Sequence, residues 1–413
     1  MAELSRGAGT SRVLSVEEED EQDHNALILY TSGTTGPPKG VVHTHGSLKA
    51  QVNTLCRAWN WSQDDVILHA LPLHHTHGLV NALLCPLTVG ARVEDAAPFK
   101  AERVWDRLLR GVGAAETARI HGGEILPCGS GQDLEGARAP PSSPSLTPVT
   151  VFMGVPTMYS RLLAALPADL ACRAPYADAA RGLRLAVTGS ATCPRPVLEA
   201  WERLAGAPLL ERYGLTETGM VLGQPLSQRG RGGVGVPFDG MEVRVEGAGE
   251  LLVRGKQLFK EYWKQPQATA DSFDDRGFFK TGDTVTLRDG WFSIAGRTSV
   301  DIVKSGGFKI SALDVENALL EHPHVRECAV FGVPDEILGE SIVALLALQP
   351  AAAASTEVAS LRGLQAWAQP RLARYQIPRE VIYVDAVPRN AMGKVNKKAL
   401  KAEYATRHKH CTT

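Results

Sequence analysis

The chain has 413 residues, of which 44% are hydrophobic and 22% are charged. That composition is typical of a globular protein with room for two or three domains. Its 44 basic residues balance 45 acidic ones. The net charge of −1 therefore gives no global field that would favour nucleic acid or a membrane surface as a partner.

Cysteines and apolar runs narrow the cellular setting. The seven cysteines are scattered and never form a Cys-x-x-Cys pair, which argues against a disulfide framework or a zinc site and favours a reducing compartment. The longest apolar run, residues 79–89, is too short to span a bilayer. The first 25 residues form an acidic tail, whereas an organelle transit peptide is basic, so the chain as given would stay in the cytosol.

From residue 26 to about residue 210, short apolar runs alternate with amphipathic stretches. Strands are predicted at 26–31, 66–73, 149–155 and 183–188, and helices at 47–59, 100–110, 157–166 and 196–205. This alternation is typical of an α/β domain with a mostly parallel sheet covered by helices. The stretch 111–148 interrupts it, because Gly, Pro, Ser and Ala dominate there without periodicity, and we expect a disordered insertion.

After Gly235 the segments become short and closely spaced. Strands are predicted at 242–246, 250–254, 284–288 and 291–295, with a hairpin turn at 288–290. They indicate a small β-rich subdomain at about 235–296, which completes a large domain of residues 26–296. A smaller α+β domain, 297–413, follows with helices at 312–320 and 356–372. Its basic run, Lys394, Lys397, Lys398 and Lys401, is expected to be mainly a solvated helix face.

The strongest chemical signal is the loop YTSGTTGPPKG at residues 30–40, which follows a predicted strand and precedes a predicted helix. Its glycines and hydroxyl residues can turn backbone N–H groups toward phosphate oxygens, and Lys39 adds a positive charge. It is no Walker A loop, because no Gly precedes Lys39 directly and no Ser or Thr follows it. The loop therefore predicts a phosphate site of another class.

This loop resembles the signature of the adenylate-forming superfamily, and further matches follow in the expected order at 71–78, 212–219, 281–283, 296–301, 304–309 and 388–394. Within the superfamily the chain is most similar to malonate–CoA ligases. The resemblance implies an ATP-dependent acid–CoA ligase with a large helix-covered domain, a β-rich subdomain and a smaller mobile C-terminal lid. It also implies ATP, Mg²⁺ and coenzyme A as ligands and the mitochondrial matrix as location.

The resemblance assigns the nucleotide contacts residue by residue. The β- and γ-phosphates would be held by Thr31, Ser32, Gly33, Thr34, Thr35, Gly36, Pro37, Pro38 and Lys39. Tyr213 would lie against adenine beside the backbone of Gly189 and Ser190, and Asp283 and Arg297 would bind the ribose hydroxyls.

Further residues would serve the reaction. By the same resemblance Thr216 would touch phosphate, and Glu217 would hold Mg²⁺, a cation that prefers carboxylate oxygen. Lys394 would reach the oxygen between the substrate carboxylate and the α-phosphate. The glycines Gly306 and Gly307 would let backbone approach the pantetheine arm of coenzyme A, although they also fit a simple hairpin turn, and Ser299 would be the hinge of the lid.

Histidines cluster near residue 75. The absence of a His-Glu-x-x-His pattern argues against a metal site at His74, His75 and His77. The resemblance places His75 at the gate of the active site and His77 in the acid pocket. His43 and His45, which follow the phosphate loop, are expected at the surface where a helix begins.

A dicarboxylic acid such as malonate, or methylmalonate, buries a second carboxylate that needs a cation. The planar fork of arginine suits it, and the resemblance assigns that contact to Arg184, with His77 nearby. The alternative is that Arg184 is a solvated residue at the start of a strand.

Three other functions stay open. They are a short- or medium-chain acyl-CoA synthetase of other specificity, an enzyme that loads a carrier protein, and a catalytically inactive fragment. The fragment is considered because relatives carry a substantial stretch before the phosphate loop, which here begins thirty residues from Met1. We therefore expect a truncated large domain with apolar faces left uncovered.

Overall fold

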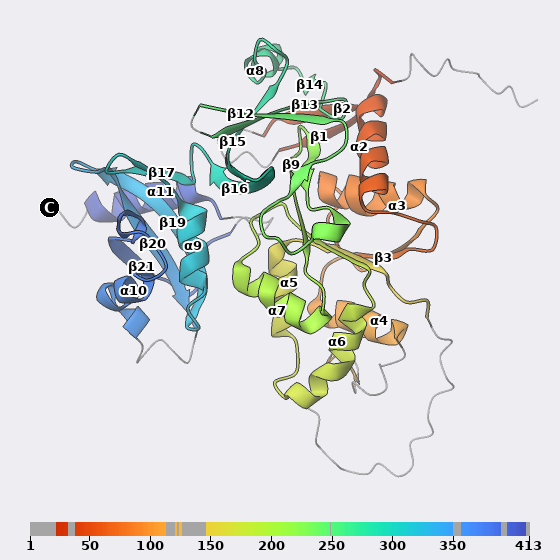
Figure 1. Cartoon of the computed structure of the whole chain (residues 1–413), viewed down its shortest axis with the longest axis horizontal. Helices are drawn as coiled ribbons and strands as arrows, with labels where there is room; N and C mark the ends of the chain where they lie inside the picture. Colours follow the sequence, from red (N-terminus) through yellow and green to blue (C-terminus); the bar gives the residue numbers. More distant parts are fainter. Residues whose placement is uncertain are drawn as a thin grey trace, which may run out of the picture.

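The computed structural model describes residues 22–31, 38–112, 120–121, 124–125, 146–247, 249–349, 357–389 and 395–409. Figure 1 shows a larger body built from the elements up to β16 and a smaller one built from β17 to α11. Within the described ranges, none of the helices combines the length and the apolar character that crossing a bilayer requires.

The larger body is organised around a seven-stranded sheet in the order β11-β10-β9-β8-β7-β3-β4. Neighbours from β9 to β4 run parallel, whereas β10 and β11 are antiparallel at one edge. Strands β3, β7 and β8 are buried along their whole length, as a parallel sheet covered on both faces requires. The strands are β3 (Val66–His69), β4 (Arg92–Asp95), β7 (Val151–Gly154), β8 (Leu185–Thr188), β9 (Leu210–Leu215), β10 (Gly219–Gly223) and β11 (Val236–Pro237). The predicted mostly parallel sheet is confirmed.

Helices cover this sheet from two sides, with α2 and α3 on one side and α4 to α7 on the other (Figure 1). Three tryptophans from these helices or their ends, Trp59, Trp105 and Trp201, are at most 1% exposed and fill the core. The helical segments are α2 (His45–Ala58), η1 (His77–Leu84), α3 (Cys85–Thr88), α4 (Ala101–Gly111), α5 (Pro156–Ala164), η2 (Leu170–Arg173), α6 (Ala174–Arg181), α7 (Arg195–Ala205) and η3 (Leu226–Gln228).

The first strand departs from the prediction. Instead of joining the parallel sheet, β1 (Asn25–Tyr30) pairs antiparallel with β2 (Gly40–Thr44), and β2 also pairs with β14 (Glu261–Tyr262) in a separate three-stranded sheet. The reason is the length of the connection. Only residues 31–39 separate β1 from β2, whereas a parallel crossover needs a dozen residues or more.

A four-stranded antiparallel sheet forms the predicted β-rich region. It comprises β12 (Met241–Glu246), β13 (Glu250–Gly255), β15 (Phe279–Arg288) and β16 (Trp291–Arg297), and helix α8 (Pro266–Asp271) lies between β14 and β15 in the chain. Asp289 and Gly290 both have positive φ, 50° and 74°, at the tip of the β15–β16 hairpin. The turn expected at 288–290 is therefore confirmed, and its geometry suits the twist of the two strands.

The smaller body contains a five-stranded sheet with α9, α10 and α11 around it. Helix α9 has the predicted bounds, but α10 is shorter than the predicted 356–372. It begins after Ser360, whose side chain caps it, and ends ahead of Pro370. The elements are β17 (Ile302–Ser305), β18 (Phe308–Ser311), α9 (Ala312–Leu320), β19 (Val325–Asp335), β20 (Gly339–Leu348), η5 (Glu357–Ala359), α10 (Leu361–Ala368), η6 (Arg374–Gln376), β21 (Glu380–Tyr383) and α11 (Lys397–Lys409).

Lys397 is not part of a solvated face. Its Nζ lies 2.6 Å from Asp301 Oδ1 and 2.7 Å from Glu316 Oε1, and its side chain is 7% exposed. Two carboxylates compensate the burial of one ammonium group, which explains why the lysine can leave solvent. The Lys397–Asp301 ion pair joins the first turn of α11 to the segment directly before β17.

The predicted insertion at 111–148 lies mostly outside the described residues. Helix α4 ends at Gly111, and two short strands, β5 (Ile120–His121) and β6 (Glu124–Ile125), pair antiparallel within the stretch. The proposed disorder of this segment therefore stays a prediction.

Candidate active site

The two ends of the predicted phosphate loop are joined by hydrogen bonds. Thr31 N donates to Lys39 O at 2.9 Å, and Lys39 N donates to Thr31 Oγ1 at 3.2 Å. The Lys39 ammonium lies 4.5 Å from the ring centroid of Tyr262 on β14. Pro38 is exposed beside Lys39, and residues 32–37 lie outside the described part of the chain. The structure thus brings Thr31 and Lys39 together at the mouth of the loop.

The three residues predicted for adenine and ribose also meet. Tyr213 Oη donates to Asp283 Oδ2 at 2.6 Å, and Arg297 Nε donates to Asp283 Oδ1 at 3.0 Å. Tyr213 comes from β9, whereas Asp283 and Arg297 are cross-strand partners on β15 and β16. Burial, and then the Asp283 carboxylate, raises the pKa of Tyr213 well above its ordinary value, so the phenol stays a donor.

The turn between β9 and β10 presents Thr216 and Glu217. Tyr262 Oη donates to Glu217 Oε1 at 2.9 Å, and Phe259 N donates to Glu217 O at 2.7 Å. Within the described residues the second carboxylate oxygen, Oε2, makes no hydrogen bond. Tyr262 is thus a shared neighbour of Glu217 and Lys39. A half-buried carboxylate with one free oxygen fits a Mg²⁺ ion that would be shared with phosphates.

A different group of residues lies where β8 and β9 end. Gly189 and Ser190 follow β8, and Arg212 Nη2 donates to Ser190 Oγ at 3.1 Å. His77 Nδ1 is 3.4 Å from the same hydroxyl. Gly189 is required here, because a Cβ at this position would lie 2.7 Å from Arg212 Nη1. Ser190 itself is exposed with φ of +67°, a strained conformation for a non-glycine residue.

Arg212 and His77 are buried donors with unmet hydrogen bonds. Arg212 is 3% exposed and His77 4% exposed, and neither Arg212 Nε nor His77 Nε2 has a hydrogen-bond partner among the described residues. Among the described residues, no carboxylate lies within ion-pair distance of Arg212. Burial lowers the pKa of Arg212 to about 9, and burial followed by the charge of Arg212 lowers the pKa of His77. An uncompensated guanidinium of this kind calls for an anion.

Arg184 does not lie with this group. It precedes β8, so the length of that strand separates it from Ser190. Its guanidinium grips Asp65 with two hydrogen bonds, Nε to Oδ1 at 2.6 Å and Nη2 to Oδ2 at 2.5 Å, and donates to Trp59 O at 3.0 Å. The arginine expected to bind the acid thus has its carboxylate within the protein, at the opposite end of the sheet from the nucleotide residues.

The remaining residues predicted for the reaction are His75, Ser299 and Lys394. His75 is half-buried in the segment before η1, its ring 4.3 Å from that of His74. Ser299 is exposed between β16 and β17. Lys394, the predicted catalytic lysine, lies outside the described residues. Its role therefore stays a prediction.

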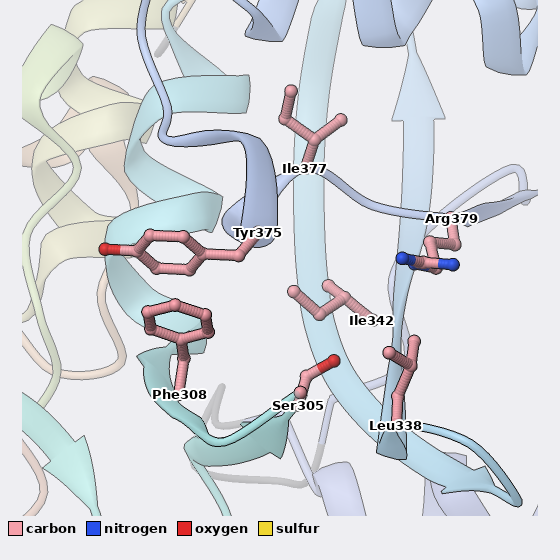
Figure 2. A pocket seen from close by; sticks show the side chains of 8 residues that line it. Ser305, Phe308, Leu338, Ile342, Tyr375, Ile377 and Arg379 are labelled. Atoms are coloured by element: carbon pink, nitrogen blue, oxygen red, sulfur yellow. The ribbon is translucent and has the colours of Figure 1, made fainter.

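The glycines Gly306 and Gly307 form the tip of the β17–β18 hairpin, with positive φ values of 57° and 82°. Gly306 borders a cavity of about 240 Å³ whose lining is largely apolar but includes Ser305 and Arg379. Figure 2 shows the rings of Phe308 and Tyr375 side by side at its edge, and their centroids are 4.0 Å apart with planes inclined by 4°.

Comparison with known proteins agrees with this arrangement. The family profile described as AMP-binding enzyme matches residues 3–113 and 136–263, more than half of the chain, and the profile AMP-binding enzyme C-terminal domain matches residues 314–394. The chain belongs to the AMP-binding enzyme family.

Several relatives in this family carry one activity in their names. Malonate–CoA ligase ACSF3, mitochondrial, of Homo sapiens is 42% identical over 423 residues, which cover 93% of this chain and 66% of the relative. The malonate–CoA ligase of Arabidopsis thaliana is 43% identical, covering 92% and 60%, and the probable CoA ligase CCL8 of Humulus lupulus is 45% identical, covering 93% and 62%. The chain thus spans less than two thirds of the length of these curated relatives.

Solved structures show the same similarity. ATP-bound MatB from Rhodopseudomonas palustris superposes with a TM-score of 0.75 at 32% identity, covering 93% of this chain and 69% of MatB. A malonyl-CoA ligase in a ternary product complex with methylmalonyl-CoA and AMP gives a TM-score of 0.55 at 40% identity, covering 90% and 73%. In the profile match, residues 114–135 fall between the two matched parts, within the predicted insertion.

Three residues around the AMP-binding elements were missed by sequence reasoning. Arg212 stands inside the 212–219 match, directly before Tyr213, but received no role. The only sequence signal at Tyr262 was its place beside Trp263, in a short aromatic run. His43, expected at the surface, is fully buried and bonded to the Thr216 carbonyl, whereas His45 is exposed at the first turn of α2, as expected.

Proposed function

We propose that the protein activates malonate with ATP and transfers the acyl group to coenzyme A. In the first half-reaction a carboxylate oxygen attacks the α-phosphorus of ATP, and the bond to pyrophosphate breaks. In the second, a thiol attacks the carbonyl carbon of the acyl-adenylate, and AMP leaves with the bonding electrons. A protein does this mainly by positioning reactants and neutralising charge.

The observation that carries the malonate assignment is Arg212. It is a buried guanidinium without a carboxylate among the described residues, and it directly precedes Tyr213, whose ring belongs to the nucleotide group. Malonate has one carboxylate to react and one to be held, and the second would pair with Arg212 and accept from Ser190 or His77. An uncharged short acid would leave the guanidinium uncompensated. Methylmalonate carries the same two carboxylates and is the second candidate acid.

Arg212 takes the role first given to Arg184. The Asp65 carboxylate already accepts two hydrogen bonds from the Arg184 guanidinium, so a substrate would have to displace a buried carboxylate there. Position in the strand order supports the same change. In an open parallel sheet, ligands bind beyond the carboxyl ends of the strands, and Arg184 is at the amino end of β8.

The nucleotide would bind through the groups already assembled at the other half of the site. Asp283 and Arg297 offer an acceptor and a donor to ribose hydroxyls, and Thr31, Lys39 and Thr216 would face the phosphates. A Mg²⁺ ion held by Glu217 would neutralise phosphate charge when bound. Lys394 keeps its proposed role at the α-phosphate, by its place in the 388–394 match.

Support for coenzyme A as the thiol comes from the cavity beside Gly306. Aromatic faces at Phe308 and Tyr375 and the cation of Arg379 suit a ligand that combines a purine with phosphates. A carrier protein would instead bring an extended surface of its own. The mitochondrial relatives support the mitochondrial matrix as the place of action, which fractionation of cells that express the full gene product would test.

The deciding experiment is acid-dependent exchange of pyrophosphate into ATP, measured with malonate, methylmalonate, acetate and octanoate. We expect malonate to support the fastest exchange and, once coenzyme A is added, malonyl-CoA to appear by mass spectrometry. Faster exchange with octanoate or acetate would make the protein a general acyl-CoA synthetase. Exchange without CoA-ester formation would favour a carrier protein, and a folded sample that binds no ATP would refute the enzyme function altogether.

A further inference from the structure

His43 connects two segments whose relative position matters for the proposed function. It lies on β2, four residues beyond Lys39, and its side chain is fully buried. His43 Nε2 is 2.7 Å from the backbone oxygen of Thr216, which is 173 residues away in the chain. A hydrogen bond thus spans from the strand that leaves the phosphate loop to the turn that carries Thr216 and Glu217.

The partners of the ring define its protonation. A carbonyl oxygen only accepts, so Nε2 must carry the proton that is shared with Thr216. Gln51 Nε2 lies 3.3 Å from His43 Nδ1 and can donate to it, because its other hydrogen goes to Gln257 O at 3.0 Å. Ser47 Oγ lies 3.2 Å from the same nitrogen. Burial lowers the pKa of His43, which agrees with a neutral ring.

The turn that His43 contacts is held on a second side as well. Phe259 N donates to the backbone oxygen of Glu217, and Tyr262 Oη donates to its carboxylate. Both come from the segment that ends in β14, which pairs with β2. His43 and Tyr262 therefore connect the same turn to the same small sheet, one through a main-chain oxygen and the other through the side chain.

We propose that His43 is a positioning residue for the ATP phosphates and Mg²⁺, which acts by fixing the Thr216–Glu217 turn against the phosphate-loop strand. The proposal rests on the proposed function, because it takes Thr216 and Glu217 as ligands of MgATP. Without the donor at Nε2 the Thr216 oxygen would be left without its partner, and the turn would lose one of its attachments to the strand that leaves the phosphate loop. Contacts with adenosine, which depend on Tyr213 and Asp283, would not change.

Two substitutions of similar polarity separate this role from simple packing. His43→Gln places an amide nitrogen near the position of Nε2 and an amide oxygen that can accept from Gln51. His43→Asn can still accept from Gln51, but its amide is too short to reach Thr216. Isothermal titration calorimetry of the whole protein with MgATP and with adenosine gives a readout that needs no turnover, and thermal unfolding checks that each variant is folded.

We expect His43→Asn to weaken MgATP binding about tenfold, the size of effect that loss of one buried hydrogen bond gives, and to leave adenosine binding unchanged. His43→Gln should restore MgATP binding to within about threefold of the starting protein. If the Asn variant melts more than about 5 °C lower, His43→Met, which fills the site without a donor, takes its place with the same expectation.

Equal MgATP binding by the starting protein and a folded Asn or Met variant would overturn the proposal. So would an equal loss of MgATP and adenosine binding, because that pattern marks a general disturbance of the fold. Failure of the unsubstituted protein to bind MgATP would refute the proposed function itself, a result that the variants cannot mimic.

Discussion

The candidate site has a nucleotide half, around Tyr213, and an acid half, around Arg212. The two halves differ in whether their polar groups have hydrogen-bond partners within the protein. In the nucleotide half, Tyr213, Asp283 and Arg297 satisfy one another with hydrogen bonds of 2.6 and 3.0 Å. In the acid half, Arg212 and His77 are buried with donors that no described residue accepts from. The polar groups of the nucleotide half thus satisfy one another, whereas those of the acid half leave donors without acceptors among the described residues.

From this difference we expect the acid half to set specificity. A group that already satisfies itself loses internal hydrogen bonds when it binds a ligand, so its net gain is modest. A buried cation without a carboxylate partner gains most of an ion pair at once, and it disfavours any acid that cannot supply the charge. Single changes in the nucleotide half should therefore alter ATP binding less than a change at Arg212 alters the choice of acid.

The largest effect is expected at Arg212. Arg212→Met should lower malonate-dependent exchange roughly a thousandfold, because losing one partner of a buried charge pair costs about 2–5 kcal/mol. Exchange with acetate, which never uses the guanidinium, should persist at its starting level. Arg212→Lys is the matched control that keeps the charge without the planar fork. Malonate turnover by the Met variant at the original rate would remove the acid half as the source of specificity.

Arg184 serves as the contrasting arginine. Arg184→Leu should lower the free energy of unfolding by roughly 3 kcal/mol, since Asp65 stays buried without its partner. The ratio of malonate to acetate activity should not change. Urea denaturation measures the first quantity and pyrophosphate exchange the second. The double variant with Asp65→Leu should recover part of the lost stability, and a changed acid preference in Arg184→Leu would restore this residue to the acid site.

A smaller effect is expected in the nucleotide half. Asp283→Asn keeps the shape but removes the charge that accepts from Tyr213 and Arg297. We expect KM for ATP to rise about thirtyfold, equivalent to about 2 kcal/mol, with the order of preferred acids unchanged. Steady-state kinetics at saturating malonate provide the measurement. A shift in acid preference would mean that the two halves are coupled rather than independent.

The smallest effect should come from Tyr262→Phe. It removes the hydroxyl that donates to Glu217 Oε1 and leaves the ring beneath Lys39. The concentration of Mg²⁺ required for half-maximal exchange should rise about fivefold, as expected for one hydrogen bond of about 1 kcal/mol. An unchanged Mg²⁺ requirement would mean that Glu217 is oriented without Tyr262.

Local patterns in the sequence were enough for much of the fold. The short continuous apolar runs that became β3, β7 and β8 are typical of strands buried on both faces. The amphipathic runs that became α2, α4 and α7 show the helical period of 3.6 residues. The pairing of β2 with β14 could not be derived in this way, because the two strands lie more than 200 residues apart in the chain. Lys397 was misjudged for the same reason, since its carboxylates come from other elements.

Within the site, motif matches singled out residues that the structure brings together in groups, Thr31 with Lys39 and Tyr213 with Asp283 and Arg297, while their roles stay predictions. The acid residue was harder, because sequence shows that an arginine is near a strand but not what already occupies its fork. Asp65, 119 residues from Arg184 in the chain, occupies that fork in the structure. A useful signal was nevertheless present. Arg184 stands at the start of its predicted strand, 183–188, whereas Arg212 adjoins Tyr213 within the matched segment, and ligands of parallel sheets gather beyond the carboxyl ends.

The buried pair of Lys397 and Asp301 limits how the C-terminal segment can travel. Asp301 follows the proposed pivot, Ser299, by two residues, and Lys397 follows Lys394 by three. An extended chain of three residues spans about 10 Å, so Lys394 is tethered within that reach of the start of α11. If the smaller body rotates about Ser299, Lys394 must move with it. The angle of that rotation would then decide whether Lys394 reaches the α-phosphate.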